Sequence, residues 1–172
     1  MENEKQVVMV LANYNYNGDE YEYTRRTLED NGIGIRIAAS ELGVCTGVTG
    51  TTTDVDLSFT NVAPEDYSGI VFIGGSGVDM YFNNDEALEL AKKFFSLNKV
   101  VAAICWAPVI LARAGVLAQR KATAWDGAKS EIEQAGGNYT GEQVTVDNNI
   151  VTAEGPESAT QFGQAIAELI GK

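Results

Sequence analysis

Short apolar runs alternate with amphipathic segments along this chain of 172 residues. The apolar runs are typical of strands buried on both faces of a sheet, and they cover residues 7–12, 33–39, 69–73 and 100–104. The amphipathic segments have the spacing of helices that bury one apolar face, and they cover residues 20–31, 85–97, 107–114, 127–135 and 158–170. Glycine is the usual residue just past a helix end, and it occurs here at positions 32, 115 and 136.

The remaining segments predict shorter elements. Residues 122–125 indicate a short strand, and residues 144–146 and 150–152 flank an Asp-Asn-Asn turn that is typical of a strand pair. Residues 42–60 are rich in Thr, Gly and Val, which is compatible with a hairpin or with an irregular excursion. Strands that alternate with helices predict an α/β fold, a three-layer sandwich with a mostly parallel sheet and helices on both faces. We expect one such domain over residues 1–172.

A cysteine lies where the fourth apolar run meets the next helix. Cys105 has Ala103 two positions before it and Ala107 two positions after it. Small residues at this spacing favour a nucleophile elbow, the sharp turn that lifts a nucleophile out of the sheet edge. A thiol held there lies near the positive end of a helix dipole, which favours the thiolate. The alternative is a buried structural cysteine, since free cysteines are often fully buried.

Other candidate residues fall at the same edge of the predicted sheet, because the carboxyl ends of parallel strands lie together and form the crevice. The pair Gly74-Gly75 ends the third strand and is either a plain turn or part of an oxyanion hole, since glycine lets a backbone N–H approach a developing negative charge. The amide of Trp106 is the candidate second donor. Several aromatic side chains are candidate pocket walls, or else pack in the core: Tyr14, Tyr16, Phe82, Trp106 and Trp125.

Composition excludes some chemistry. The chain contains no histidine, so histidine cannot act as a general acid or base from within it. With two cysteines and no imidazole, we expect no metal site and no cofactor. The net charge of −12 argues against nucleic acid or an anionic membrane as a partner. The chain shows neither a membrane-spanning apolar run nor a secretion signal, so we expect a cytoplasmic protein with Cys45 and Cys105 reduced.

Several motifs together resemble a known family. They are Asp19-Glu20-Tyr21, Asp66-Tyr67-Ser68-Gly69-Ile70-Val71-Phe72-Ile73-Gly74-Gly75, Ala103-Ile104-Cys105-Trp106-Ala107-Pro108, Arg120-Lys121-Ala122-Thr123 and Val151-Thr152-Ala153-Glu154-Gly155-Pro156. In this order they resemble the ThiJ/PfpI superfamily, whose fold is flavodoxin-like and related to the class I glutamine amidotransferases. The resemblance runs over nearly the whole chain and implies a flavodoxin-like sandwich.

The resemblance also implies roles for particular residues. The elbow cysteine of the family is its reactive residue, which corresponds to Cys105, and an acid at the start of the first helix bonds to its sulfur, which corresponds to Glu20. The glycine pair corresponds to Gly74-Gly75 and implies that Gly75 supplies an oxyanion amide. Members are usually dimers or hexamers, so we expect a homodimer or a higher homo-oligomer. Reported activities include peptidase, cofactor-free glyoxalase, deglycase, chaperone and oxidative-stress sensing.

Departures from the family pattern narrow these activities. Peptidase-like members have histidine directly after the nucleophile, where this chain has Trp106, and place a third, acidic residue where it has Asp79. Glyoxalase-like members have a histidine where this chain has Trp125. We therefore do not expect a Cys–His–acid protease. The remaining site is a Cys105–Glu20 pair with backbone amides, with Gly74, Trp125, Asp79 and Tyr14 as candidate pocket residues.

Three functions fit such a site. The first is an enzyme in which Cys105 adds to a small reactive carbonyl compound and Glu20 carries the proton. The second is a sensor whose Cys105 is oxidised by a small oxidant. The third is a family member that binds a ligand with little catalysis. Cys45 is a candidate for a separate redox or interface role.

Overall fold

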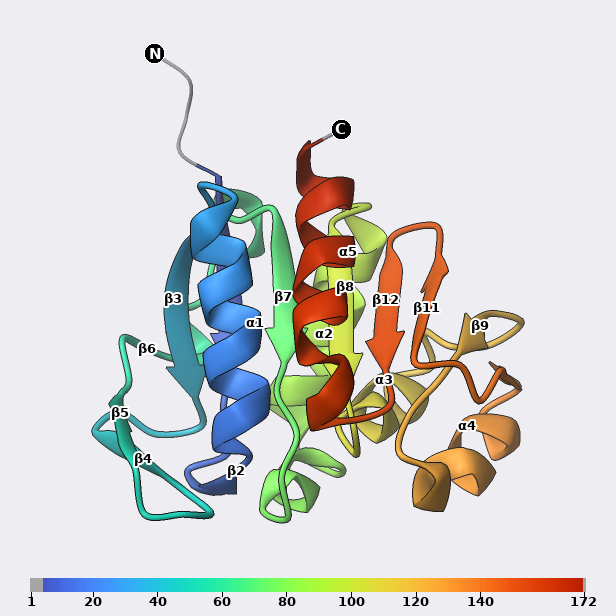
Figure 1. The fold of residues 1–172 in the computed structure, drawn as a ribbon, viewed down its shortest axis with the longest axis horizontal. Coiled ribbons are helices and arrows are strands. Elements are labelled where there is room, and N and C mark those ends of the chain that lie inside the picture. Colours follow the sequence, from blue (N-terminus) through green and yellow to red (C-terminus); the bar gives the residue numbers. More distant parts are fainter. Residues whose placement is uncertain (1–4, 172) are drawn as a thin grey trace.

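The computed structural model describes residues 5–171. Within this range the main sheet has seven strands in the order β11-β12-β8-β7-β1-β3-β6 (Figure 1). All neighbouring strands of this sheet run parallel except β11, which pairs with β12 as an antiparallel hairpin. The strands are β1 (Gln6–Val10), β3 (Gly34–Ala39), β6 (Leu57–Ser58), β7 (Gly69–Phe72), β8 (Val100–Ile104), β11 (Val144–Asp147) and β12 (Ile150–Ala153).

Helices cover both faces of the sheet, as the alternating sequence pattern predicts. Helices α1 (Gly18–Asp30) and α5 (Ala159–Gly171) pack against each other on one face, in front of the sheet in Figure 1. Helices α2 (Asp85–Ser96) and α3 (Pro108–Arg113) cover the other face, and α4 (Lys129–Gln134) lies beside α3. The central strands β7 and β8 are buried along their whole length, which explains their continuous apolar runs. The flavodoxin-like three-layer sandwich is therefore confirmed.

Two small sheets and five 3-10 turns complete the described chain. One sheet contains β2 (Tyr14–Tyr16), β4 (Val44–Gly47) and β5 (Thr52–Asp54), and the other contains β9 (Lys121–Ala122) and β10 (Asn138–Tyr139). The segment over residues 42–60 thus contains the hairpin β4–β5, which is antiparallel. The 3-10 turns are η1 (Phe59–Asn61), η2 (Pro64–Asp66), η3 (Val78–Tyr81), η4 (Asp126–Ala128) and η5 (Pro156–Ser158).

The predicted strand over residues 122–125 is wrong beyond Ala122. Strand β9 ends there, and the next residues turn toward the main sheet because their polar groups bond to it. The Thr123 N–H donates to Thr152 Oγ1 at 2.9 Å, and the Trp125 N–H donates to the Cys105 carbonyl at 2.8 Å. This irregular segment therefore carries Trp125 to the carboxyl end of β8.

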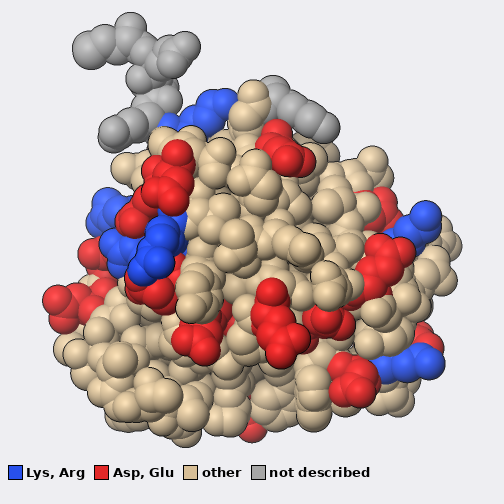
Figure 2. Space-filling model, viewed as in Figure 1, with Lys and Arg blue, Asp and Glu red and all other residues tan. Residues whose placement is uncertain are grey.

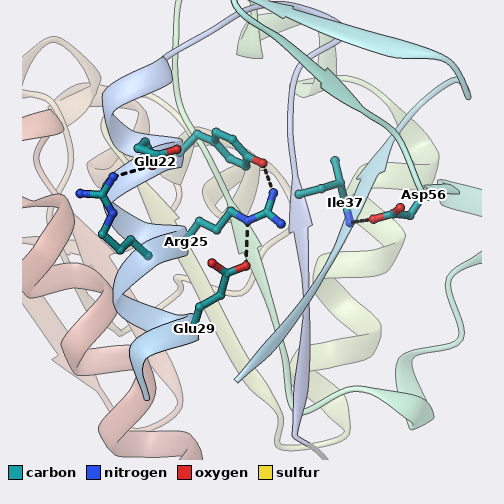
Figure 3. Close-up of polar contacts among 7 residues, drawn as sticks. Glu22, Arg25, Glu29, Ile37 and Asp56 are labelled. Atoms are coloured by element: carbon teal, nitrogen blue, oxygen red, sulfur yellow. Dashed lines mark hydrogen bonds and ion pairs between the residues drawn. The ribbon is translucent and has the colours of Figure 1, made fainter. Parts of the chain in front are cut away.

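The exposed face of α1 holds two ion pairs at helical spacing (Figure 3). Arg25 Nε lies 2.9 Å from Glu29 Oε1, and Arg26 Nη2 lies 2.8 Å from Glu22 Oε1. Because all four side chains are well exposed, each pair contributes about 0.5 kcal/mol or less. These charges support the helix and take no part in the site. The same view shows the neighbouring strand β3, where the Ile37 N–H donates to Asp56 Oδ2 at 2.8 Å.

The surface of the protein is acidic, with 24 Asp and Glu against 12 Lys and Arg. Figure 2 shows the acidic groups spread over the visible face instead of gathered in one patch. No helix among residues 5–171 has the length and apolar character needed to cross a bilayer.

Candidate active site

The candidate site lies at the carboxyl edge of the main sheet, at the point where the order of the strands reverses. From β1 the chain passes to β3 on one side, whereas β7, β8 and β12 follow on the other side. Such a switch point leaves a crevice beyond the strand ends. Three loops meet there: the one that leads from β1 into α1, the one after β7 that contains Gly74, and the turn after β8 that contains Cys105.

Cys105 occupies a strained turn between β8 and α3. Its φ angle is +65°, in the left-handed region that residues other than glycine rarely adopt. The conformation is fixed from both sides, because the Cys105 N–H donates to the Ala153 carbonyl at 2.9 Å and the Cys105 carbonyl accepts from the Trp125 N–H at 2.8 Å. Strain of this kind costs about 1–3 kcal/mol and persists where its surroundings hold it. The backbone therefore has the geometry of a nucleophile elbow.

Glu20 lies beside this turn and is completely buried. Asn17 caps α1 by accepting the Glu20 N–H at 3.0 Å, which sets the phase of the helix and directs Glu20 inward. Glu20 Oε1 accepts the Gly74 N–H at 3.0 Å, whereas Oε2 has no hydrogen-bond partner among the described residues. A Cβ atom on Gly74 would lie 2.6 Å from Oε1 and 3.0 Å from Cys105 Cβ, so only glycine permits this approach.

Burial controls the protonation of both groups. It raises the pKa of the Glu20 carboxyl from its ordinary value of 4.5 to about 8, against the opposing effect of the Gly74 hydrogen bond. Burial, and after it the neighbouring Glu20 carboxylate, raises the pKa of the Cys105 thiol to about 12, although the Trp106 N–H opposes this. The expectation that the following helix favours a thiolate is therefore wrong. Helix α3 has only six residues, and its dipole does not outweigh burial.

Two backbone amides are candidate donors to an oxyanion, those of Trp106 and Gly75. The Trp106 N–H points at Cys105 and lowers the pKa of its thiol. Gly75 has a φ angle of +128°, and a Cβ atom there would lie 2.3 Å from the Asn15 carbonyl oxygen. The Gly75 N–H forms no hydrogen bond with another described residue, whereas the Gly74 N–H is engaged by Glu20. The two glycines therefore differ. The Gly74 N–H binds Glu20, whereas the Gly75 N–H has no partner among the described residues.

Aromatic rings form one side of the site. Trp106 contacts Phe82 and Trp125 edge to face, with ring centres 5.0 and 6.3 Å apart. Trp125 is 47% exposed and lines a surface pocket of about 500 Å³. A Cβ atom on Gly127 would lie 2.2 Å from the Trp125 ring, so this glycine lets the indole fold back against the chain.

Two predicted pocket residues, Tyr14 and Asp79, are exposed. Tyr14 is 69% exposed although Tyr16, two residues later, is buried, because Asn15 between them has a φ angle of +60° and the pairing of β2 with β4 is irregular there. Asp79 is exposed on η3, where Val78 and Tyr81 supply the buried face. Tyr14 and Asp79 do not line the pocket that Trp125 walls, and neither do Cys105 and Gly74. The place of Tyr14 and Asp79 in a pocket around Cys105 stays a prediction.

Other residues of the pocket that Trp125 walls are absent from the sequence prediction. They are Asp126, Tyr139, Glu154 and Glu157. One signal was available for Glu154, since it directly follows β12 at the carboxyl edge. Tyr139 was not predictable, because its position depends on the pairing of β10 with β9.

Fold and site together define a flavodoxin-like α/β protein with a cysteine elbow and a buried acid beside it. A model of the DJ-1/PfpI family matches residues 5–169, and the chain belongs to this family. A protein of Pyrococcus abyssi named a deglycase is 36% identical, with 95% of this chain and 98% of that protein aligned. An uncharacterized protein of Methanocaldococcus jannaschii is 38% identical over all of this chain and 85% of its own length.

Solved structures agree with this assignment. A ThiJ/PfpI domain protein from Brachyspira murdochii superposes with a TM-score of 0.95 at 28% identity, covering 98% of both chains. Drosophila melanogaster DJ-1beta superposes with a TM-score of 0.86 at 26% identity, covering 99% of this chain and 92% of its own.

Proposed function

We propose that the protein acts on small reactive carbonyl compounds, as a glyoxalase, deglycase or hydrolase that needs no cofactor. The observation that carries this proposal is the buried Glu20 carboxyl beside the strained Cys105, with one oxygen that has no hydrogen-bond partner among residues 5–171. Relatives that are named deglycases and are 35–36% identical support the substrate class. One of them is a protein of Pyrococcus furiosus that is 35% identical.

The chemistry begins with addition of the Cys105 thiol to the carbonyl carbon. As the sulfur–carbon bond forms, the thiol proton passes to ionised Glu20 and the carbonyl π electrons move to oxygen. The N–H groups of Gly75 and Trp106 donate to this oxyanion. Glu20 then returns the proton to the oxygen, which gives a neutral hemithioacetal. A carboxyl with a pKa of about 8 is suited to both steps near neutral pH.

Loss of the thiol tests this proposal directly. Purified Cys105→Ser is expected to consume methylglyoxal about 100-fold more slowly than the unchanged protein, or worse, and Cys45→Ala is the matched control, expected to stay within about twofold. Because the attack needs ionised Glu20, the rate of the unchanged protein is expected to rise with pH and to level off above about pH 8. Equal turnover by Cys105→Ser and the unchanged protein would refute a nucleophilic role for Cys105.

Oxidation sensing is a second candidate, favoured by the protonated state of Glu20 at neutral pH. Two molecules of peroxide would add two oxygen atoms to the Cys105 sulfur and be reduced to water, giving a sulfinic acid. A protonated Glu20 then donates to one sulfinate oxygen through Oε2, which has no partner among the described residues of the reduced protein. Intact mass after mild peroxide tests this function, which requires the two added oxygens on Cys105 and none on Cys105→Ser.

A further inference from the structure

Three side-chain oxygen atoms inside the protein have no hydrogen-bond partner among residues 5–171. They are Glu20 Oε2, Thr24 Oγ1 and Ser158 Oγ, and their residues are at most 1% exposed. Other buried hydroxyls of the described chain are paired: Thr123 Oγ1 donates at 2.6 Å, and Thr152 Oγ1 accepts at 2.9 Å. The buried oxygens without a partner therefore belong to α1 and to the turn η5, which leads into α5.

Helix packing brings these three residues together. Glu20 and Thr24 are four residues apart on α1, so their side chains lie on the same face of that helix. Helix α5 packs closely against α1 here, since a Cβ atom on Gly163 would lie 3.3 Å from the Thr24 carbonyl oxygen. Both helices lead away from the carboxyl edge of the sheet and run in the same direction (Figure 1). Ser158 lies five residues before Gly163 and therefore near the level of Glu20, where η5 contacts α1.

Buried oxygens of this kind point to an internal water. Polar atoms inside proteins almost always have a partner, and where the protein supplies none the partner is an ordered water. Such a water typically forms about three hydrogen bonds, and three oxygens without a partner meet at this junction. Leaving all three dry would cost the desolvation of a carboxyl and of two hydroxyls without compensation.

The proton chemistry of Glu20 suits a water partner. Glu20 Oε1 accepts the Gly74 N–H, which leaves Oε2 to carry the proton of the acid form. A partner of Oε2 must donate to the ionised carboxylate and accept from the protonated one. Water and hydroxyl groups do both, whereas a backbone N–H only donates. The titratable groups that act on the pKa of Glu20 are Cys105, whose hydrogen bond lowers it, and Asp19, whose negative charge raises it.

We propose that one internal water joins Glu20 Oε2 to the hydroxyls of Thr24 and Ser158, which act through it as positioning residues for the Glu20 carboxyl. The two hydroxyls donate to the water, and the water donates to ionised Glu20. When Glu20 is protonated, it donates to the water and the water donates to a hydroxyl. The inference deepens the proposed function and rests on it in one respect, because that reaction requires Glu20 to change its protonation.

Titration of Glu20 without substrate tests this site. The carbonyl stretch of a protonated carboxyl, assigned by its loss in Glu20→Gln, measures the protonated fraction at each pH. Thr24→Val/Ser158→Ala removes both hydroxyls and with them the support for the ionised carboxylate. Its midpoint is expected to rise by about one pH unit, a tenfold change in proton affinity. An unchanged midpoint in the folded variant overturns the inference.

Two further variants show whether the hydroxyls themselves cause the shift. Thr24→Ser keeps a hydroxyl at the same place and is expected to keep the midpoint of the unchanged protein. Thr27→Val is the matched control on α1, because Thr27 Oγ1 donates to the Tyr23 carbonyl at 2.8 Å and has no part in the site. A rise in Thr27→Val as large as that in Thr24→Val/Ser158→Ala would assign the shift to the helix and overturn the inference.

A high-resolution crystal structure of the unchanged protein is a second test that does not depend on a variant folding. We expect a water within hydrogen-bond distance of Glu20 Oε2 and of the Thr24 and Ser158 hydroxyls. The same water is expected in Cys105→Ser and is expected to be lost in Thr24→Val/Ser158→Ala. A junction that contains no water in the unchanged protein overturns the inference.

Turnover separates this inference from the proposed function. In Thr24→Val/Ser158→Ala, the pH at which methylglyoxal consumption levels off is expected to rise by about one unit, with the plateau rate within about twofold. The water and the shifted midpoint in a protein without turnover support the inference and refute the enzyme. Turnover by a protein that shows neither the water nor the shift overturns the inference and leaves the proposed function standing.

Discussion

The two cysteines of the chain are chemically identical and lie in very different surroundings. Cys45 is completely buried in β4, whereas Cys105 is partly exposed at the elbow after β8. Burial raises the pKa of the Cys45 thiol to about 11, and burial together with Glu20 raises that of Cys105 to about 12. Acidity therefore does not distinguish the two thiols. Access to solvent and a nearby proton acceptor do.

The surroundings of each thiol explain this difference. Cys45 pairs with Thr53 across the β4–β5 hairpin, and no carboxylate affects the pKa of its thiol. Such a thiol packs as a small apolar side chain, which leaves no support for a redox role of Cys45. Cys105 has the Glu20 carboxyl beside it, and in the proposed reaction this carboxylate accepts the thiol proton as the sulfur–carbon bond forms. The strained turn at Cys105 and the amides of Gly75 and Trp106 would assist this reaction only with Glu20 beside the thiol.

The largest expected difference between the two thiols is in their alkylation. Iodoacetamide should label Cys105 in the folded protein about 1,000-fold faster than Cys45, since Cys45 becomes accessible only when the chain opens locally. Peptide mass spectrometry after timed quenching measures both rates. Addition of denaturant is the control and should bring the two rates together. Comparable labelling of both thiols in the folded state would show that Cys45 and Cys105 do not differ in their access to solvent.

The second expected effect is on stability. It concerns Glu20, the acid that lies beside Cys105 and has no counterpart beside Cys45. The pKa of Glu20 is 4.5 when unfolded and about 8 when folded, so the folded state holds a proton that the unfolded state loses between these values. The stability that comes from holding this proton on Glu20 is fully present below pH 4.5 and is lost as pH rises toward 8. Glu20→Gln, which keeps an acceptor for the Gly74 N–H, should therefore be the more stable protein at pH 7, by about 3 kcal/mol.

Denaturant unfolding at pH 4.5 and at pH 7 measures this change. The two proteins should have closely similar stability at pH 4.5 and diverge at pH 7. Glu22→Gln is the control on the same helix, because Glu22 is exposed and forms only a surface ion pair with Arg26. A pH-independent difference between Glu20→Gln and the unchanged protein would contradict a buried, protonated Glu20.

Sequence patterns predicted the fold well because its strands are buried on both faces. Continuous apolar runs such as residues 69–73 and 100–104 indicate such strands without reference to distant contacts. Strand β2 escaped prediction for the opposite reason. Strand β2 is only three residues long and polar at its centre, where Asn15 has a φ angle of +60°. Its pairing with β4 depends on a contact between segments about thirty residues apart.

The site was predictable in part. The small residues around Cys105 indicated the elbow, because a sharp turn between strand and helix needs them. Three acids open α1, and the sequence alone could not say which one is buried, since that depends on the Asn17 cap. The resemblance to the family selected Glu20, which the structure places beside Cys105. The raised pKa of the Cys105 thiol was not predictable, because it follows chiefly from burial by distant segments.

The smallest expected effect distinguishes two roles of Glu20. Its charge and hydrogen bonding raise the pKa of the Cys105 thiol after burial does, so Glu20→Gln should lower that pKa. One pKa unit is a tenfold change in thiolate. We therefore expect Cys105 in Glu20→Gln to be alkylated by iodoacetamide about tenfold faster at pH 9.

The same variant should react more slowly with an aldehyde. Alkylation needs only a thiolate, whereas hemithioacetal formation also needs an acid that returns the proton to oxygen. Opposite changes in the two rates would identify Glu20 as a proton carrier, with Glu22→Gln as the control that changes neither. Parallel slowing of both rates would instead mean that Glu20 generates the thiolate, and Cys105 would then differ from Cys45 in acidity after all.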